Sequence, residues 1–101
     1  MSMEYGAFDT ALAAAVGDDP TLVAELRQAF VGSAKRQLDL LGRSRCDANW
    51  QYSCYRLKGL AASFGVNEII ALAEEANAGA PGDPVVLRKL GVAIANLENP
   101  L

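Results

Sequence analysis

The stretch WQYSCYRLKGLAASFG, residues 50–65, carries the clearest structural signal in the chain. Its apolar residues recur at intervals of four, three, four and three residues, which is the spacing of one face of an amphipathic helix. These residues are Trp50, Cys54, Leu57, Ala61 and Phe64. Gly65 then ends the pattern, as glycine commonly does at the end of a helix. The stretch predicts a helix with one buried face.

Four further segments show helical spacing. Residues 7–16 and 20–42 precede the stretch, and a polar connection over residues 43–49 joins them to it. Two more segments follow the stretch, one after Asn67 and one after Asp83. Asp19 and Asp83 each come before a proline, so we expect each to cap a helix whose first residue is that proline. Asn67 is the predicted N-cap of the fourth helix, whose buried face we expect to consist of Ile70, Ala73 and Ala76.

No segment shows the alternation of a strand, so the predicted fold class is all-α. Short connections favour antiparallel neighbours. We therefore expect an antiparallel up-down four-helix bundle with a short additional N-terminal helix, formed by residues 1–101 as a single domain.

Composition restricts the classes of function. Apolar residues make up 51% and charged residues 21% of the chain, which is typical of a globular protein. The net charge of −3 and the pI near 4.8 argue against nucleic-acid binding, which needs a basic surface. No apolar run approaches the length of a membrane span and no secretory signal opens the chain, so we expect a cytoplasmic protein.

The chain contains no histidine and only two cysteines. Zinc sites, Ser-His and Cys-His nucleophile pairs, and the residue most used in general acid–base catalysis are therefore absent. The neighbouring acids Glu74 and Glu75 point to different sides of a helix, so we interpret them as solvated. We expect neither an enzyme nor a metal or other cofactor.

The outward face of the 50–65 helix differs from an ordinary solvated face. Tyr55, Gly59, Ala62 and Gln51 lie about 100–180° from the buried face, and Lys58 lies on the flank. A glycine at an exposed helical position costs about 1 kcal/mol relative to alanine. Close approach of a partner would explain Gly59. The alternatives are that Gly59 packs beneath the first helix or is merely tolerated.

The segment CYRLKGLAASFG, residues 54–65, resembles the signature helix of the histidine-containing phosphotransfer domains of bacterial phosphorelays. That motif runs histidine, a variable residue, leucine, lysine, glycine and then small residues to a closing glycine. The resemblance extends over nearly the whole chain. Its other parts are a first helix ending in VGDDP, a long second helix with Phe30, the Trp50 before the motif, LAEEA in the fourth helix, and a final amphipathic helix.

At the position of the family's phosphorylated histidine, this chain has Tyr55. Lys58 and Gly59 match the lysine beside the phosphoryl group and the glycine that leaves room for a receiver domain. Asn77 falls where the family often has a polar side chain near the histidine. A phenol is almost entirely un-ionised at neutral pH, and phosphotyrosine is an inert ester. We therefore expect docking to be retained and phosphotransfer to be lost.

The resemblance implies a partner-binding surface built from the first three helices. The candidate residues on these helices are Tyr55, Lys58, Gly59, Gln51, Ala62, Phe8 and Leu12, and Asn77 of the fourth helix is added as the polar side chain near the histidine position. The expected partner is the receiver domain of a response regulator or a sensor histidine kinase, bound by a monomer of this chain. Two alternatives stay open: a phosphorelay carrier that lost its histidine by mutation, and a helical homodimer unrelated to signalling that associates through the Tyr55 face.

Overall fold

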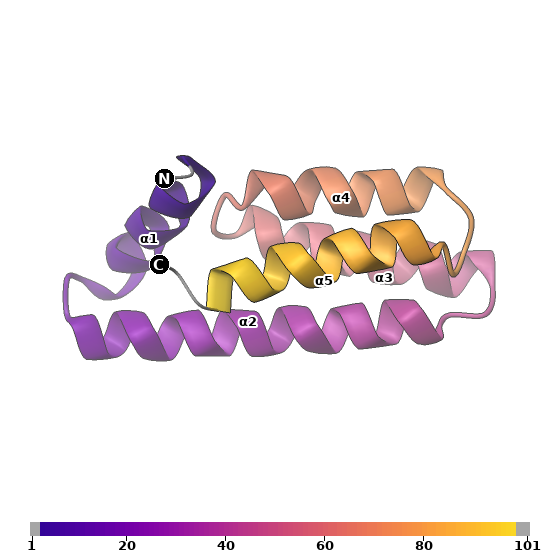
Figure 1. Ribbon diagram of the computed structural model, residues 1–101. Helices are drawn as coiled ribbons and strands as arrows, with labels where there is room; N and C mark the ends of the chain where they lie inside the picture. Colours follow the sequence, from indigo (N-terminus) through magenta and orange to yellow (C-terminus); the bar gives the residue numbers. More distant parts are fainter. Residues whose placement is uncertain (1–2, 99–101) are drawn as a thin grey trace.

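The computed structural model describes residues 3–98, which form five helices and no strand (Figure 1). The helices are α1 (Met3–Val16), α2 (Pro20–Arg43), α3 (Asp47–Ala62), α4 (Asn67–Ala78) and α5 (Pro84–Glu98). The predicted all-α fold class is confirmed.

Helices α2 to α5 pack around one core. The α2 helix contacts α3 and α5, and α4 contacts the same two helices from the other side. Helix α1 packs against α2 and is inclined to the other helices, at the end of the molecule where α2 begins and α5 ends (Figure 1). Over the part of the chain that the structure describes, no helix combines the length and apolarity needed to cross a membrane.

The two Asp-Pro pairs start helices as predicted. Asp19 Oδ1 accepts hydrogen bonds from the amides of Thr21 at 2.9 Å and Leu22 at 3.4 Å, and Asp83 Oδ1 accepts one from Val85 at 2.9 Å. Each carboxylate thus satisfies a free amide in the first turn of its helix.

The starts of α3 and α4 differ from the prediction. Helix α3 begins at Asp47, inside the expected connection, where a carboxylate in the first turn interacts favourably with the helix dipole. Asn67 is the first residue of α4, and Val66 occupies the N-cap position without any side-chain cap. The prediction of Asn67 as an N-cap is therefore wrong. Position 66 is instead held by burial, because Val66 is only 1% exposed.

The core draws side chains from all five helices. Its buried members include most of the predicted faces, with differences at Phe64 and in α4. Phe64 is only partly buried and lies two residues after the end of α3. Ile69 is buried at 1% exposure, whereas Ile70 is only partly buried. Ile69 lies four residues before Ala73 and seven before Ala76, whereas Ile70 lies three and six residues before them, so the spacing of one helix face in fact favours Ile69.

Three phenylalanines attach α1 to the rest of the core. Phe8 of α1 packs on Phe30 of α2 with ring centroids 5.1 Å apart, and Phe64 lies 5.4 Å from Phe30 and 6.2 Å from Phe8. Both contacts of Phe64 are edge-to-face, an arrangement that contributes beyond apolar burial.

Arg27 of α2 reinforces this attachment. Its guanidinium forms an ion pair with Asp9 of α1 and lies over the Phe8 ring, 5.3 Å from the centroid. It also donates a hydrogen bond to the carbonyl oxygen of Leu97 at 3.1 Å. One side chain therefore connects α1, α2 and the last turn of α5.

Trp50 joins α3 to α4. Its indole is 1% exposed, and Nε1 donates a hydrogen bond of 2.7 Å to the carbonyl oxygen of Ala76, near the end of α4. Buried indole N–H groups need such a partner. The bond holds α3 and α4 in one relative position.

Replacing Trp50 by phenylalanine is expected to lower the free energy of unfolding by about 1–3 kcal/mol, because a buried hydrogen bond is lost and space is left unfilled. Urea unfolding followed by far-UV circular dichroism measures the change. Tyr55→Phe is the matched control on the exposed face of α3, with an expected change below about 0.5 kcal/mol. Equal changes in the two variants would contradict the role given to Trp50.

Candidate docking surface

Tyr55 projects from the middle of α3 into solvent. Its side chain is 75% exposed, the largest exposed fraction among the exposed large hydrophobic residues of residues 6–98. Gln51, Gly59 and Ala62 are exposed on the same side of α3. The predicted outward face of this helix is confirmed as a surface.

Gly59 lies one turn after Tyr55 and is open to solvent. Apart from the backbone of its own helix and its chain neighbours, no atom of the residues that the structure describes lies within 4 Å of the position that a Cβ on Gly59 would occupy. The alternative in which this glycine packs beneath the first helix is therefore wrong. The fold does not need a glycine here, so close approach by a partner and simple tolerance are the readings left.

Phe8 and Leu12 do not belong to this surface. Both side chains are 0% exposed and are part of the core, because α1 turns its apolar face toward α2. They cannot contact a partner while α1 is docked. We correct the predicted binding surface accordingly: α1 contributes no contact through these two residues.

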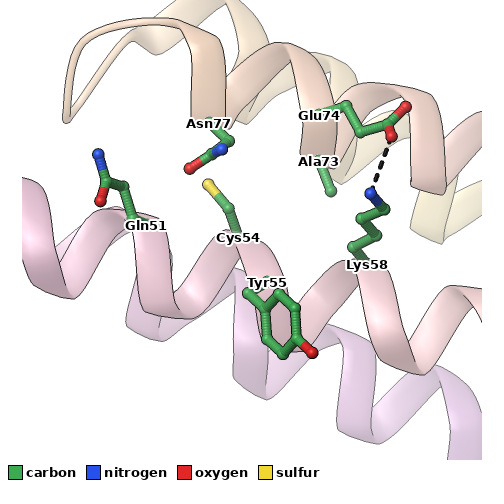
Figure 2. Close-up of a pocket in the computed structure, with 7 residues that line it drawn as sticks. All are labelled: Gln51, Cys54, Tyr55, Lys58, Ala73, Glu74 and Asn77. Carbon is green, nitrogen blue, oxygen red and sulfur yellow. Dashed lines mark ion pairs between the residues drawn. The ribbon is translucent and has the colours of Figure 1, made fainter.

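A groove of about 500 Å³ lies between parts of α3 and α4 beside Tyr55 (Figure 2). Cys54 and Ala73, two small and buried residues, line it from the facing helices, which leaves the space between them. Asn77 of α4 lines the same groove as Tyr55. Both residues border this groove, and the role that the resemblance implies for Asn77 stays a prediction.

Lys58 is engaged across this groove. Its Nζ lies 2.9 Å from Oε2 of Glu74 in α4, and both side chains are about half exposed (Figure 2). Glu75 instead pairs with Lys89 of α5 at 3.3 Å. The two adjacent acids point to different sides of α4, as predicted, but both form ion pairs. The sequence did not predict that Glu74 pairs with Lys58, because this pairing depends on how α3 and α4 are placed relative to each other.

The two cysteines have different environments. Cys46 is exposed at the start of α3, whereas Cys54 is buried, and this burial raises the pKa of the Cys54 thiol. A thiol that stays protonated at neutral pH is a poor nucleophile. Among the residues that the structure describes, no three His, Cys, Asp or Glu side chains come together in a way that could hold a metal ion.

Comparison with known proteins adds no relative: no family model matches the chain, and neither a curated protein nor a solved structure is significantly similar to it. The resemblance to phosphotransfer domains therefore rests on the motifs of the sequence itself.

Gly59→Ala is expected to raise the free energy of unfolding by about 0.5–1 kcal/mol, because alanine favours the helix and its methyl group meets no neighbour. Thermal and urea unfolding measure this. Gly65→Ala is the matched control, since Gly65 has a φ of +66° and an alanine there is expected to destabilise by about 1–2 kcal/mol. A destabilised Gly59→Ala variant would indicate that the fold itself requires this glycine.

Proposed function

We propose that the protein is a phosphotransfer-like module of a two-component pathway that docks onto a receiver domain, or onto a kinase, without accepting phosphate. One observation carries the proposal. Tyr55 stands exposed where the motif has its histidine, and the lysine and glycine of the motif, Lys58 and Gly59, accompany it on the same helix.

Loss of phosphotransfer follows from the chemistry at this position. The phenol of tyrosine is a weak nucleophile at neutral pH, and the chain has no histidine to act as a base. Lys58, which in the motif would accompany a phosphoryl group, is paired with Glu74. An incoming anion would have to compete with this carboxylate for the lysine. We therefore propose that the protein does not carry out phosphotransfer at Tyr55.

Docking is supported by the shape of the surface. Tyrosine presents a large and rigid contact area with little side-chain freedom to lose, and is frequent at binding hot spots. Gly59 and Ala62 add almost no bulk beside it, so the backbone of a partner can approach α3 closely. Gln51 and Asn77 provide polar groups at the edge of the groove.

The arrangement of the helices is also part of this proposal. Contacts of α2 with α3 and α5, and of α4 with the same two helices, support an antiparallel up-down four-helix bundle, with α1 as the additional N-terminal helix. We further propose that the module acts as a cytoplasmic monomer.

Receiver domains encoded in the same genome are the probes for docking. We expect one of them to bind the wild-type protein in titration calorimetry. Tyr55→Ala is expected to weaken binding about tenfold or more, as loss of a central aromatic contact does. Gly59→Gln should have a similar effect, because a long side chain would stand in the interface.

Val92→Ala is the control for docking, since Val92 is exposed on α5, away from the Tyr55 surface. It is expected to leave the affinity unchanged. Unchanged affinity in both Tyr55→Ala and Gly59→Gln would remove the proposed surface. Sedimentation at several protein concentrations tests the homodimer alternative, in which the Tyr55 face binds a second copy.

Phosphotransfer is tested with a radiolabelled receiver. We expect no label on the wild-type protein after incubation with phosphorylated receivers, and labelled wild type would overturn the proposal. Tyr55→His distinguishes a dedicated docking module from a carrier that lost its histidine: transfer of label to this variant would favour the carrier. Tyr55→Gln provides the background for both measurements.

A further inference from the structure

Charge is unevenly distributed along the chain. Residues 20–62, which comprise α2, α3 and their connection, contain seven Lys and Arg residues against three Asp and Glu residues, a net charge of +4. The remaining residues contain two basic against nine acidic side chains, a net charge of −7, which accounts for the overall −3. The α2–α3 pair is a basic element within an acidic protein.

Three of the seven basic side chains, Arg36, Arg45 and Arg56, form no ion pair with a residue that the structure describes. The other four pair with carboxylates of α1, α2, α4 and α5. The fold therefore balances most of the positive charge of these helices but leaves these arginines available.

Arg56 is held in place although it has no acidic partner. Its Nη1 donates a hydrogen bond of 3.0 Å to the hydroxyl of Tyr52, one turn earlier, and its guanidinium carbon lies 5.6 Å from the centroid of the Tyr52 ring. Most of its N–H donors are left unused. A guanidinium ordered in advance loses little freedom when it binds a carboxylate.

Arg36 is held in a similar way. Its Nη2 lies 3.1 Å from Oγ of Ser33, to which it donates a hydrogen bond, and its Nη1 is 3.5 Å from the position that a Cβ on Gly32 would take. The guanidinium thus folds back along α2, over a residue that has no side chain to displace it.

The two arginines lie at nearly the same height on neighbouring helices. Arg36 is nine residues before position 45, the middle of the connection, and Arg56 is eleven residues after it. At about 1.5 Å per residue, they are about 14 and 17 Å from the connection. Arg56 is two residues before Lys58, which faces α4, and therefore lies on the opposite flank of α3, toward α2.

The hydrogen bond to Ser33 holds the Arg36 guanidinium on the side of α2 that faces α3. Lys35 contacts Glu98 of α5, and Ser33, two residues earlier, is on the other side of the helix, toward α3. Leu40 of α2, 52% exposed, lies one turn after Arg36, and Tyr52 of α3 is 60% exposed. We call Arg36, Leu40, Tyr52 and Arg56 the arginine face.

We propose that the arginine face binds an acidic surface of a partner protein, with Arg36 and Arg56 each pairing with a carboxylate side chain and Leu40 and Tyr52 contacting an apolar group between them. Guanidinium groups match carboxylates in geometry as well as in charge. The inference goes beyond the proposed docking at Tyr55, because it states the charge of the partner and does not require that partner to be a receiver domain.

The test uses a defined probe, the peptide acetyl-Glu-Glu-Phe-Glu-Glu-amide, titrated into the ¹⁵N-labelled protein at low ionic strength. Chemical-shift changes are expected to gather at the arginine face and to diminish as salt is added. The matched peptide with glutamine in place of each glutamate is expected to cause no such changes. Binding of both peptides alike would overturn the proposal.

Single substitutions then distinguish a specific binding site from non-specific attraction between opposite charges. Arg36→Gln and Arg56→Gln are each expected to weaken the acidic peptide about threefold, the scale of an exposed ion pair. Arg88→Gln removes the same charge from an exposed arginine of α5 that also forms no ion pair with a described residue, and is expected to change the affinity less than twofold.

Equal losses in all three variants would show that only net charge matters and would overturn the proposal. A heparin oligosaccharide then distinguishes an acidic protein surface from other polyanions. If it binds the arginine face more tightly than the peptide does, the site recognises sulfate or phosphate polyanions, and the assignment to an acidic protein surface is wrong. Since no receiver domain is used, these outcomes are independent of the test of docking at Tyr55.

Discussion

Trp50 determines how α3 is rotated about its own axis, and the direction of each candidate binding residue on α3 follows from that rotation. Its indole is buried and its Nε1 bonds the carbonyl of Ala76, so α3 can neither turn nor slide along α4 without breaking that bond. A residue five positions further along a helix is rotated by about 140°. Tyr55 is therefore directed outward by the same contact that buries Trp50.

The same rotation sorts the charged side chains of α3. Lys58 falls on the flank beside α4, where Glu74 neutralises it, and Arg56 falls on the flank beside α2, where no carboxylate of the described residues pairs with it. The outward face of α3, which carries Tyr55, thus has the neutralised Lys58 on one flank and Arg56, which forms no ion pair with a described residue, on the other. The Tyr55 surface and the arginine face are consequences of a single packing arrangement.

Much of this could be predicted from the sequence, because it depends on local chemistry. The spacing from Trp50 to Phe64 predicted both the buried and the outward face of α3, and the Asp-Pro pairs predicted two helix starts. Predictions failed where a tertiary contact overrides local preference. Asn67 is a better cap than Val66 in isolation, but Val66 is buried in the core and α4 begins one residue later.

In the candidate surface too, local features could be predicted from the sequence and tertiary contacts could not. Outward residues of α3 were predictable, whereas the burial of Phe8 and Leu12 depends on the docking of α1 through Phe30, Phe64 and Arg27, which are distant in sequence. The resemblance alone did not indicate that these two side chains are buried. The pairing of Lys58 with Glu74 likewise depends on the relative height of α3 and α4, which no local pattern encodes.

The Tyr55 surface is unfavourable in terms of stability alone. A helix selected only for stability would have alanine at position 59 and a polar side chain at position 55. The ion pair of Lys58 is half exposed, and such pairs contribute at most about 1 kcal/mol. A partner that offers its own carboxylate can therefore displace Glu74 from Lys58 at little cost, whereas a phosphoryl group would meet only the weakly nucleophilic phenol of Tyr55. The local chemistry thus suits exchangeable contacts with a protein better than covalent transfer.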